Sequence, residues 1–376
     1  MWSVILVEDA DPLQLWQAWR LAAPSCFPVG RRFTVRAPVP VHRKHFQACV
    51  WLVLTTVVWG LSFPLIKTIL LKQQQLVPAA SSAFLASLIA VVRFGVAAVI
   101  VALFCARTLP QCTRREVWQG AGLALFGGFG IILQMDGLAH TLASTSAFLT
   151  QFTCLLIPIW VASTRRTLPR MAVLISLALV LAGGAILSKF DWRQFRMGRG
   201  EAETLLAAMF FTGQILWLEK PEFAENRTSH FTVVMFVGTA LIALPVAAFS
   251  APTASAFLEA HADVSVLAMI GALVLLCTIG GYGLMNYWQR YVTATEAGLI
   301  YCVEPVAASL FALFLPEWLS RTARIHYPDE QITRELLLGG GLILAANVLI
   351  QLETAQRMRK QAAVAVRASG PSSLTQ

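Results

Sequence analysis

Long, uninterrupted apolar runs dominate the chain from about residue 46 onward. A helix needs roughly 20 apolar residues to cross about 30 Å of hydrocarbon, and ten runs approach that length. They cover residues 46–71, 83–106, 117–138, 142–163, 170–188, 202–219, 231–250, 264–288, 293–315 and 335–353. Strands of a membrane barrel would alternate apolar and polar residues, which these runs do not. The pattern therefore predicts an all-α integral membrane protein with ten transmembrane helices.

The chain also resembles itself when it is shifted by about 150 residues. Residues of the fourth run recur in the ninth, and residues of the first run recur in the sixth. The matches are Thr145, Ala147 and Leu149 with Thr295, Ala297 and Leu299, and Gly60 and Lys67 with Gly213 and Lys220. Because five runs separate each pair, the second copy would enter the membrane upside down. The pattern predicts two inverted five-helix repeats, an architecture of secondary transporters that bind substrate at the repeat interface.

The remaining segments complete the predicted organisation. The first 45 residues hold five prolines and several basic residues, so we expect a poorly ordered extension there. The predicted units are the extension 1–45, the first repeat 46–190, an external linker 191–201, the second repeat 202–356 and a tail 357–376. Linkers between runs are short except at 189–201 and 316–334.

Composition agrees with a membrane protein. Hydrophobic residues make up 57% of the chain and charged residues only 13%, about half the charged fraction of a soluble domain. The net charge of +9 comes from basic clusters between apolar runs, which indicates membrane topology rather than nucleic-acid binding. If the N-terminus is inside, 19 Lys and Arg residues lie on the inner side and 8 on the outer side, with Lys67 and Arg93 within helices. This excess predicts that both termini are cytoplasmic.

Several short motifs follow one another in a set order along the runs. They are Trp59-Gly60-Leu61-Ser62-Phe63-Pro64, Gly137-Leu138, residues 145–150, Pro158, Ala297-Gly298-Leu299-Ile300, Glu304-Pro305-Val306 and residues 341–344. In this order they resemble the EamA-type carriers of the drug/metabolite transporter superfamily, over residues 46–356. Pro316-Glu317 and the long loop 318–334 depart from the family pattern.

The resemblance implies a secondary carrier in which helices 1, 4, 6 and 9 line a central site. It also implies a multi-pass protein of a bacterial inner membrane that exports a small metabolite or drug-like solute. Trp59 of the first motif and Gln214 of the sixth run lie on two of these helices. We therefore include both among the expected substrate-binding residues.

Glu304 is the most informative side chain. Counted from Thr293 it lies roughly 16 Å into its helix, close to the bilayer centre. An acidic residue there costs roughly 2.5–3.5 kcal/mol on insertion scales, so it should face a cavity or a partner. Pro305 removes the helical donor for the Tyr301 carbonyl and opens the backbone at the same depth. Glu304 is either a protonatable or substrate-contacting group, or half of a structural pair with a buried base.

Other polar groups in the runs divide between site and structure. Gln151 and Tyr301 occupy equivalent repeat positions and are the stronger pair of cavity candidates. Arg93 lies at mid-depth, where it either contacts an anionic substrate or pairs with Glu304 or Asp136. Lys67, near a helix end, is expected to extend to the lipid headgroups. Thr293 and Glu296 fit a capping box, so Glu296 receives no transport role.

No catalytic motif occurs in the chain. It has no G-x-x-x-x-G-K-[ST] phosphate loop and no H-E-x-x-H metal motif. The seven cysteines are scattered without a C-x-x-C pair and are expected to be small buried apolar residues. We therefore predict no enzyme activity, metal or cofactor, and expect a small-molecule substrate and the lipid bilayer as partners. Two alternatives remain open: a nucleotide-sugar or sugar-phosphate exchanger, and a membrane-embedded enzyme or channel-forming subunit of a larger complex.

Overall fold

A computed structural model describes residues 41–368 except 142, 167, 188–197 and 330–333. Most of the predicted extension, most of the linker 191–201 and the end of the tail lie outside the described residues. Within the described residues, 41–45 belong to the first helix and 357–368 continue the last one, so both helices run beyond the predicted apolar runs.

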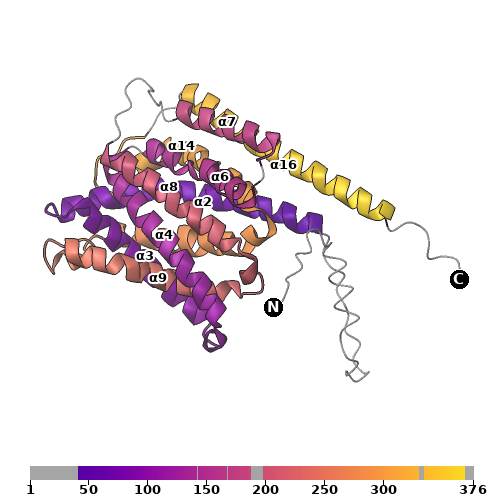
Figure 1. Cartoon of the computed structure of the whole chain (residues 1–376). Helices are drawn as coiled ribbons and strands as arrows, with labels where there is room; N and C mark the ends of the chain where they lie inside the picture. Colours follow the sequence, from indigo (N-terminus) through magenta and orange to yellow (C-terminus); the bar gives the residue numbers. More distant parts are fainter. Residues whose placement is uncertain (1–40, 142, 167, 188–197, 330–333, 369–376) are drawn as a thin grey trace. The chain divides into compact units, whose positions relative to one another are not determined.

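The described residues form helices and no strand (Figure 1). Each of the ten apolar runs coincides with one helix or with consecutive helices. These are α2 (Val41–Leu76), α3 (Ser82–Phe104), α4 (Arg114–His140), α5 (Ala143–Thr150) with α6 (Thr153–Arg165), α7 (Met171–Leu187), α8 (Arg199–Leu218), α9 (Thr228–Ser250), α11 (Val264–Ala272) with η3 (Leu273–Tyr282) and α12 (Gly283–Trp288), α13 (Ala294–Tyr301) with α14 (Glu304–Ala312), and α16 (Arg334–Ala368). Short elements connect them: η1 (Leu109–Gln111), η2 (Pro221–Phe223), α10 (Ala256–Glu259), η4 (Gln289–Tyr291) and α15 (Leu315–Ala323).

Length and composition qualify fewer than ten of these helices as membrane spans. Among the described residues, 5 helices are long and apolar enough to cross a membrane, or up to 6 if the bent pair formed by residues 294–312 and 315–323 counts as one span. The shorter apolar helices are Thr153–Thr164, Met171–Ile186 and Leu337–Ile350. The fold is therefore that of a helical, multi-pass membrane protein, whereas the count of ten spans stays a prediction.

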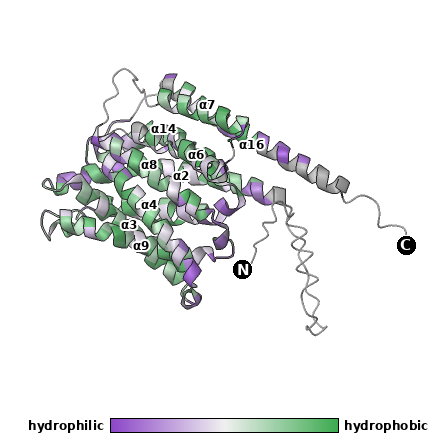
Figure 2. Ribbon diagram, in the orientation of Figure 1, coloured by the Kyte–Doolittle hydropathy of each residue, from purple (hydrophilic) through white to green (hydrophobic). Residues whose placement is uncertain are grey.

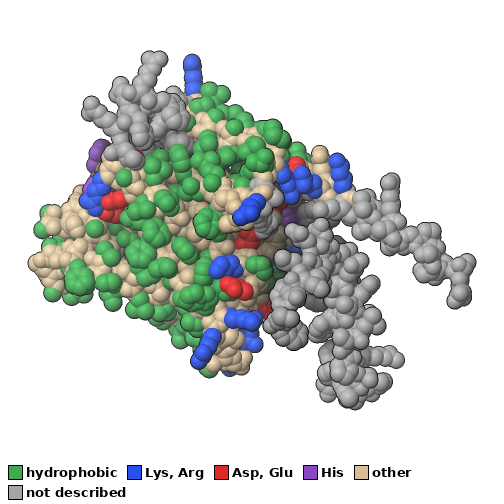
Figure 3. Space-filling view, viewed as in Figure 1, with side chains coloured by type: hydrophobic (Ala, Val, Ile, Leu, Met, Phe, Trp, Pro, Cys, Tyr) green, Lys and Arg blue, Asp and Glu red, His purple; other side chains and the backbone are tan. Residues whose placement is uncertain are grey.

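The surface of the described helices suits lipid. Phe249 is 93% exposed and Leu241 62% exposed on α9, where water would penalise them. Apolar residues follow the helices along most of their length (Figure 2). In the view of Figure 3, hydrophobic side chains cover the middle of the helical part, and charged side chains gather mostly toward its two ends. This distribution is the one expected of helices that cross a hydrocarbon layer.

Helices from distant parts of the sequence pack side by side. α3 packs along α9, α7 along α16, and α4 against both α8 and α9. α2 packs against the α11–η3–α12 segment and α14, while α5 contacts α14 and α6 contacts α13. The core therefore consists mainly of contacts between the first and second halves of the chain.

Helix caps explain several boundaries. The capping box at the start of α13 is confirmed: the Thr293 hydroxyl accepts from the Glu296 N–H, and the Glu296 carboxylate accepts from the Thr293 N–H. A second box, Thr113 with Glu116, begins α4. The loop expected after the ninth run instead contains α15, which is bent by 60° from the preceding helices. Pro316 lies in the first turn of α15, where the helix needs no backbone N–H donor, so it favours a helix start there.

Polar contacts join helix ends. The Lys72 ammonium lies 3.1 Å from the Asp263 carboxylate, connecting the end of α2 to the start of α11. Hydrogen bonds from Ser265, with Lys72 adding to them, lower the pKa of Asp263 to about 2. The Asp263 carboxylate is therefore ionised at neutral pH.

Lys67 does not extend toward headgroups as expected. Its ammonium donates to the Leu138 carbonyl at 2.7 Å and to the carbonyls of Ala139 and Thr141 at 3.4 Å. These oxygens end α4, where helical donors are missing and the helix dipole is negative. Lys67 is thus a C-terminal cap supplied by a neighbouring helix.

Replacing Lys67 by Met should therefore destabilise the protein. We expect a loss of about 1–2 kcal/mol in the free energy of unfolding, since three carbonyls lose a cationic donor. Lys220→Met is the matched control in the other half: Lys220 lies 3.6 Å from an exposed Glu222 and over the Trp217 ring. Its loss should stay below about 1 kcal/mol. Thermal unfolding in detergent checks both, and equal shifts for the two variants would contradict the capping role.

Candidate functional site

Two interrupted helices face each other in the core. One breaks between α5 and α6, at Gln151 and Phe152, and the other between α13 and α14, at Cys302 and Val303. Backbone hydrogen bonds between residues three positions apart replace the usual α-helical hydrogen bonds there. The Cys154 N–H donates to the Gln151 carbonyl, and the Cys302 N–H donates to the Leu299 carbonyl. Because α5 contacts α14 and α6 contacts α13, the two interruptions lie close together.

Proline chemistry explains the second break. Pro305 lies at the second position of α14 and has no N–H for the Tyr301 carbonyl. This is the backbone opening expected from the sequence. α5 ends at Thr150 and α13 ends at Tyr301. The repeat equivalence of Gln151 and Tyr301 stays a prediction.

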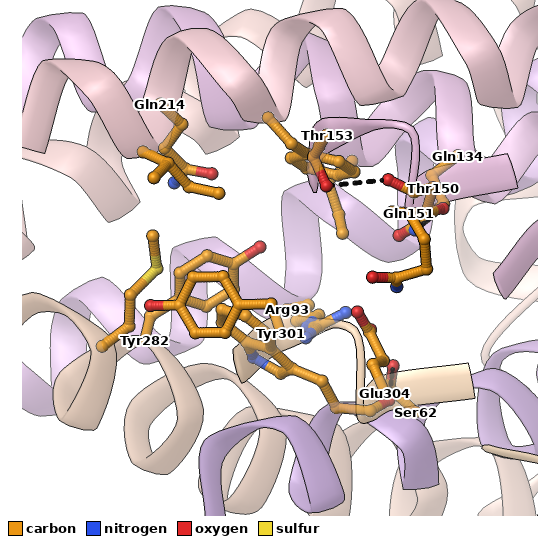
Figure 4. Close-up of a pocket in the computed structure, with 15 residues that line it drawn as sticks. Ser62, Arg93, Gln134, Thr150, Gln151, Thr153, Gln214, Tyr282, Tyr301 and Glu304 are labelled. Carbon is orange, nitrogen blue, oxygen red and sulfur yellow. Dashed lines mark hydrogen bonds between the residues drawn. The ribbon is translucent and has the colours of Figure 1, made fainter. Parts of the chain in front are cut away.

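A cavity lies beside the interruptions (Figure 4). Its lining comes from both halves of the chain and mixes carboxyl, guanidinium, amide, hydroxyl and aromatic groups. The lining residues are Trp59, Ser62, Arg93, Ile131, Gln134, Thr150, Gln151, Thr153, Phe211, Gln214, Ile215, Tyr282, Met285, Tyr301 and Glu304. Concave sites with an apolar wall and a few convergent polar groups are typical of ligand pockets.

All six residues expected at the site from the sequence line this cavity: Glu304, Tyr301, Gln151, Gln214, Arg93 and Trp59. Their role in binding stays a prediction. Sequence reasoning did not select Tyr282, Phe211, Thr150 or Thr153. Aromatic and hydroxyl side chains are common in membrane helices, so no local signal separates these from ordinary packing residues.

Glu304 is the acidic group of the cavity. It is 8% exposed and begins α14, so its carboxylate lies at the positive end of a helix dipole. The Gln151 amide faces this carboxyl group from the other interrupted segment (Figure 4). Among the described residues no cation forms an ion pair with Glu304. Its carboxyl group is therefore free to bind a proton or a cationic group of a solute.

Arg93 does not pair with either carboxylate considered from the sequence. Its Nε donates to the Thr278 hydroxyl at 2.5 Å, and Asp136 instead pairs with Arg199 at 2.5 Å. Thr278 lies in η3, where the wider helical turn lets its hydroxyl reach the Leu273 carbonyl. The Arg93 Nη1 is buried and has no hydrogen-bond partner among the residues that the structure describes. The Arg93 guanidinium in the cavity therefore has an N–H donor available for a ligand.

An aromatic wall closes one side of the cavity. The Trp59 ring lies 5.2 Å from the Tyr282 ring and 5.5 Å from the Tyr301 ring, measured between centroids. Trp59 is held by its indole N–H, which donates to the Cys277 carbonyl at 3.2 Å. The Tyr301 hydroxyl donates to Gln289 at 2.9 Å, so its ring, rather than its hydroxyl, is the part free for a ligand. Such a wall suits the apolar or cationic part of a solute.

The amides occupy the opposite side. Gln134 donates to the Thr150 hydroxyl at 2.9 Å, and the Gln214 amide lies 3.9 Å from the Met235 sulfur, a weak acceptor. Gln214 thus keeps most of its hydrogen-bonding capacity. The whole arrangement can hold a small solute that has both polar and apolar parts.

Comparison with known proteins finds a distant relative. The chain is 24% identical over 309 residues to an uncharacterized transporter of Archaeoglobus fulgidus, an alignment that covers 82% of this chain and 87% of the relative. A chain of known crystal structure matches with a TM-score of 0.55 at 16% identity, covering 83% of this chain and 99% of that one. This second likeness concerns the fold alone. No family model matches, so the resemblance to EamA-type carriers stays a prediction.

Proposed function

We propose that the chain is a secondary transporter that moves a small metabolite or drug-like solute across the cell membrane by alternating access. The observation that carries the proposal is the cavity between the halves, where two interrupted helices meet beside the Glu304 carboxyl group, which forms no ion pair with another described residue. Interrupted helices at a repeat interface are the usual substrate and ion sites of such transporters. The similarity to an uncharacterized transporter agrees with this class.

Helix packing supports the proposed inverted repeats. In an inverted repeat, each helix of the first half corresponds to the helix five runs later in the second half. When corresponding helices are exchanged, the α3–α9 pair and the α7–α16 pair each map onto themselves. The contact of α4 with α8 maps onto that of the α11–α12 segment with α2, and both are present. The contacts of α8 with α5 and α6 likewise map onto those of α2 with α13 and α14. A two-fold relation between the halves accounts for all of these pairings.

Polar contacts at the helix ends support ten alternating spans. If the chain crosses the membrane at each run, two ion pairs fall on its outer side: Lys72 with Asp263, and Arg199 with Asp136. His45 and Glu296 both fall on the inner side and lie 3.6 Å apart. In each of these pairs, both residues lie on the same side of the membrane, as the topology with ten spans requires. We therefore propose both termini inside, in agreement with the excess of basic residues there.

One of these contacts suggests where the outer gate lies. The Arg199 guanidinium connects α8 to Asp136 of α4 at the outer end. In the proposed cycle this link breaks when the halves rock open to the outside, and Glu304 loads a proton or solute from one side and releases it to the other.

The cavity disfavours the exchanger of anions considered from the sequence. Arg93 is the one basic side chain among the described residues that line it, since Lys67 caps α4 instead. A nucleotide sugar or sugar phosphate would need more cationic donors for its phosphates. Membership of the EamA-type carriers, and export as the direction, rest on the motif order and remain part of the proposal.

Reconstitution of the purified chain tests transport. Liposomes containing the protein and a trapped pH-sensitive dye are exposed to a panel of amino acids, sugars, nucleosides and organic cations under an imposed pH gradient. We expect at least one solute to change the internal pH without ATP or a partner protein, and protein-free liposomes to show no response. Absence of any solute-dependent response, with protein shown to be folded and inserted, would contradict the proposal.

A further inference from the structure

A second cluster of reactive side chains lies away from the cavity, where the connection between α3 and α4 meets the start of α9. Cys112, Glu116 and His230 each direct one potential ligand atom there, all within 4.8 Å of one another. Glu116 and His230 are buried and Cys112 is partly exposed. From this geometry we propose a binding site for a divalent transition metal ion of the zinc class, with Cys112, Glu116 and His230 as its protein ligands.

The hydrogen bonds around His230 are compatible with a cation between His230 and Glu116. The Thr108 hydroxyl lies 3.1 Å from the Cys105 carbonyl, to which it donates, and 3.2 Å from the His230 Nε2, from which it can accept. In the neutral tautomer that this arrangement suits, the Nε2 carries the proton. The Nδ1 then presents a lone pair to the Glu116 carboxylate oxygen only 3.0 Å away. Two lone pairs at this distance repel unless a proton or a metal ion lies between them.

A metal fits this arrangement better than a proton alone because a third donor is at hand. Sulfur, nitrogen and oxygen ligands bind zinc at about 2.0–2.3 Å, so neighbouring ligand atoms of one ion lie roughly 3–4 Å apart. The Nδ1–Oε2 separation already falls at this value, and a rotation of the partly exposed Cys112 side chain closes the remaining gap. The Cys105 thiol donates to the Val101 carbonyl at 3.0 Å, which leaves the fourth position to water.

The surroundings hold the ligands as an outer shell does in known metal sites. The Glu116 oxygens accept from the backbone N–H groups of Thr113 at 2.7 Å and Arg227 at 2.9 Å, which fixes the carboxylate. A hydrogen bond from the His230 Nε2 to the Thr108 hydroxyl, 3.2 Å away, would hold the ring in the form that leaves Nδ1 free for the metal. Metal-bound histidines usually donate their other N–H to such a partner. A bound ion would clamp the α3–α4 connection to α9, independently of solute transport.

Metal titration of the purified full-length protein tests the site. After treatment with a chelator, we expect one equivalent of Co²⁺ to produce thiolate-to-metal charge-transfer absorption, which one equivalent of Zn²⁺ then removes. Cys112→Ser should abolish the charge-transfer band. Cys105→Ser, the matched control on the same connection, should keep the band and the affinity for Zn²⁺.

Thr108→Val keeps all three ligands and tests the argument about the ring. It should weaken Zn²⁺ binding by roughly 10–100-fold, the usual effect of removing an outer-shell partner. Unchanged Zn²⁺ binding by Cys112→Ser, or no stoichiometric Co²⁺ binding by the unmodified chain, would overturn the site and leave a proton between His230 and Glu116.

Discussion

Glu304→Gln is expected to abolish pH-driven solute flux in liposomes while leaving the protein folded. The amide keeps the size of the carboxyl group but cannot take up or release a proton. Because Glu304 begins a helix and forms no ion pair among the described residues, its loss strands no buried partner. The melting temperature should therefore stay within a few degrees of the unmodified chain, and flux driven by the pH gradient should fall to that of protein-free liposomes.

Glu296→Gln is the matched control for this change. Glu296 lies eight residues earlier, on the same interrupted segment, but belongs to the capping box of α13 and not to the cavity. Glutamine also completes a capping box, so pH-driven flux should persist. Exchange of solute for solute by Glu304→Gln would identify the carboxyl group as the coupling group rather than a binding group. Full pH-driven flux by the Glu304→Gln protein would end its proposed role.

The second large effect is expected at Gly60, where α2 crosses α14. A Cβ atom on Gly60 would lie 2.7 Å from the Ala307 Cβ and 2.8 Å from the Ala308 backbone nitrogen. The neighbour is backbone and cannot rotate away, so the helices must separate. Gly60→Ala should cost about 1–3 kcal/mol in the free energy of unfolding. Gly60→Leu should prevent stable folding, or displace α14 and with it Glu304.

Gly95→Leu controls for the loss of a glycine from a membrane helix. An added Cβ at Gly95 in α3 meets nothing within 4 Å. We expect normal expression, melting temperature and flux for this variant. Fluorescence-detected size-exclusion chromatography with a thermal melt compares the variants. Tolerance of leucine at both positions would contradict the close approach of α2 and α14.

The apolar runs predicted the helices well, because a span of hydrocarbon permits few alternatives to a continuous helix. The place of the selected polar residues in the cavity also follows from the sequence, because groups such as Glu304, Gln151 and Arg93 are rare and costly in apolar segments. Their role in binding stays a prediction. The capping box of Glu296 is a local pattern and is confirmed. Each of these predictions depends on a local sequence pattern or on composition.

The errors concern contacts between distant segments. The acceptors of Lys67 are backbone carbonyls 71 to 74 residues away, and the partner of Arg93 is a threonine hydroxyl 185 residues away. Carbonyls and hydroxyls occur throughout the chain, so no residue type marks them as partners of a buried cation. Charge alone suggested carboxylates, but Asp136 pairs with Arg199, and Glu304 forms no ion pair among the described residues. The Cys112, Glu116 and His230 cluster was missed for the same reason, since His230 joins it only through the packing of α9 against α4.

The most direct test of transport through the cavity is side-specific labelling of a cysteine placed in it. Ser62 lines the cavity from α2, whereas Thr68 on the same helix is 0% exposed and does not line it. In a chain whose native cysteines are replaced, Ser62→Cys should react with a membrane-impermeant thiol reagent applied from either face. A transported solute should slow both reactions, and Thr68→Cys should stay unlabelled. Labelling of Ser62→Cys from one face only, or from neither, would contradict alternating access through this cavity.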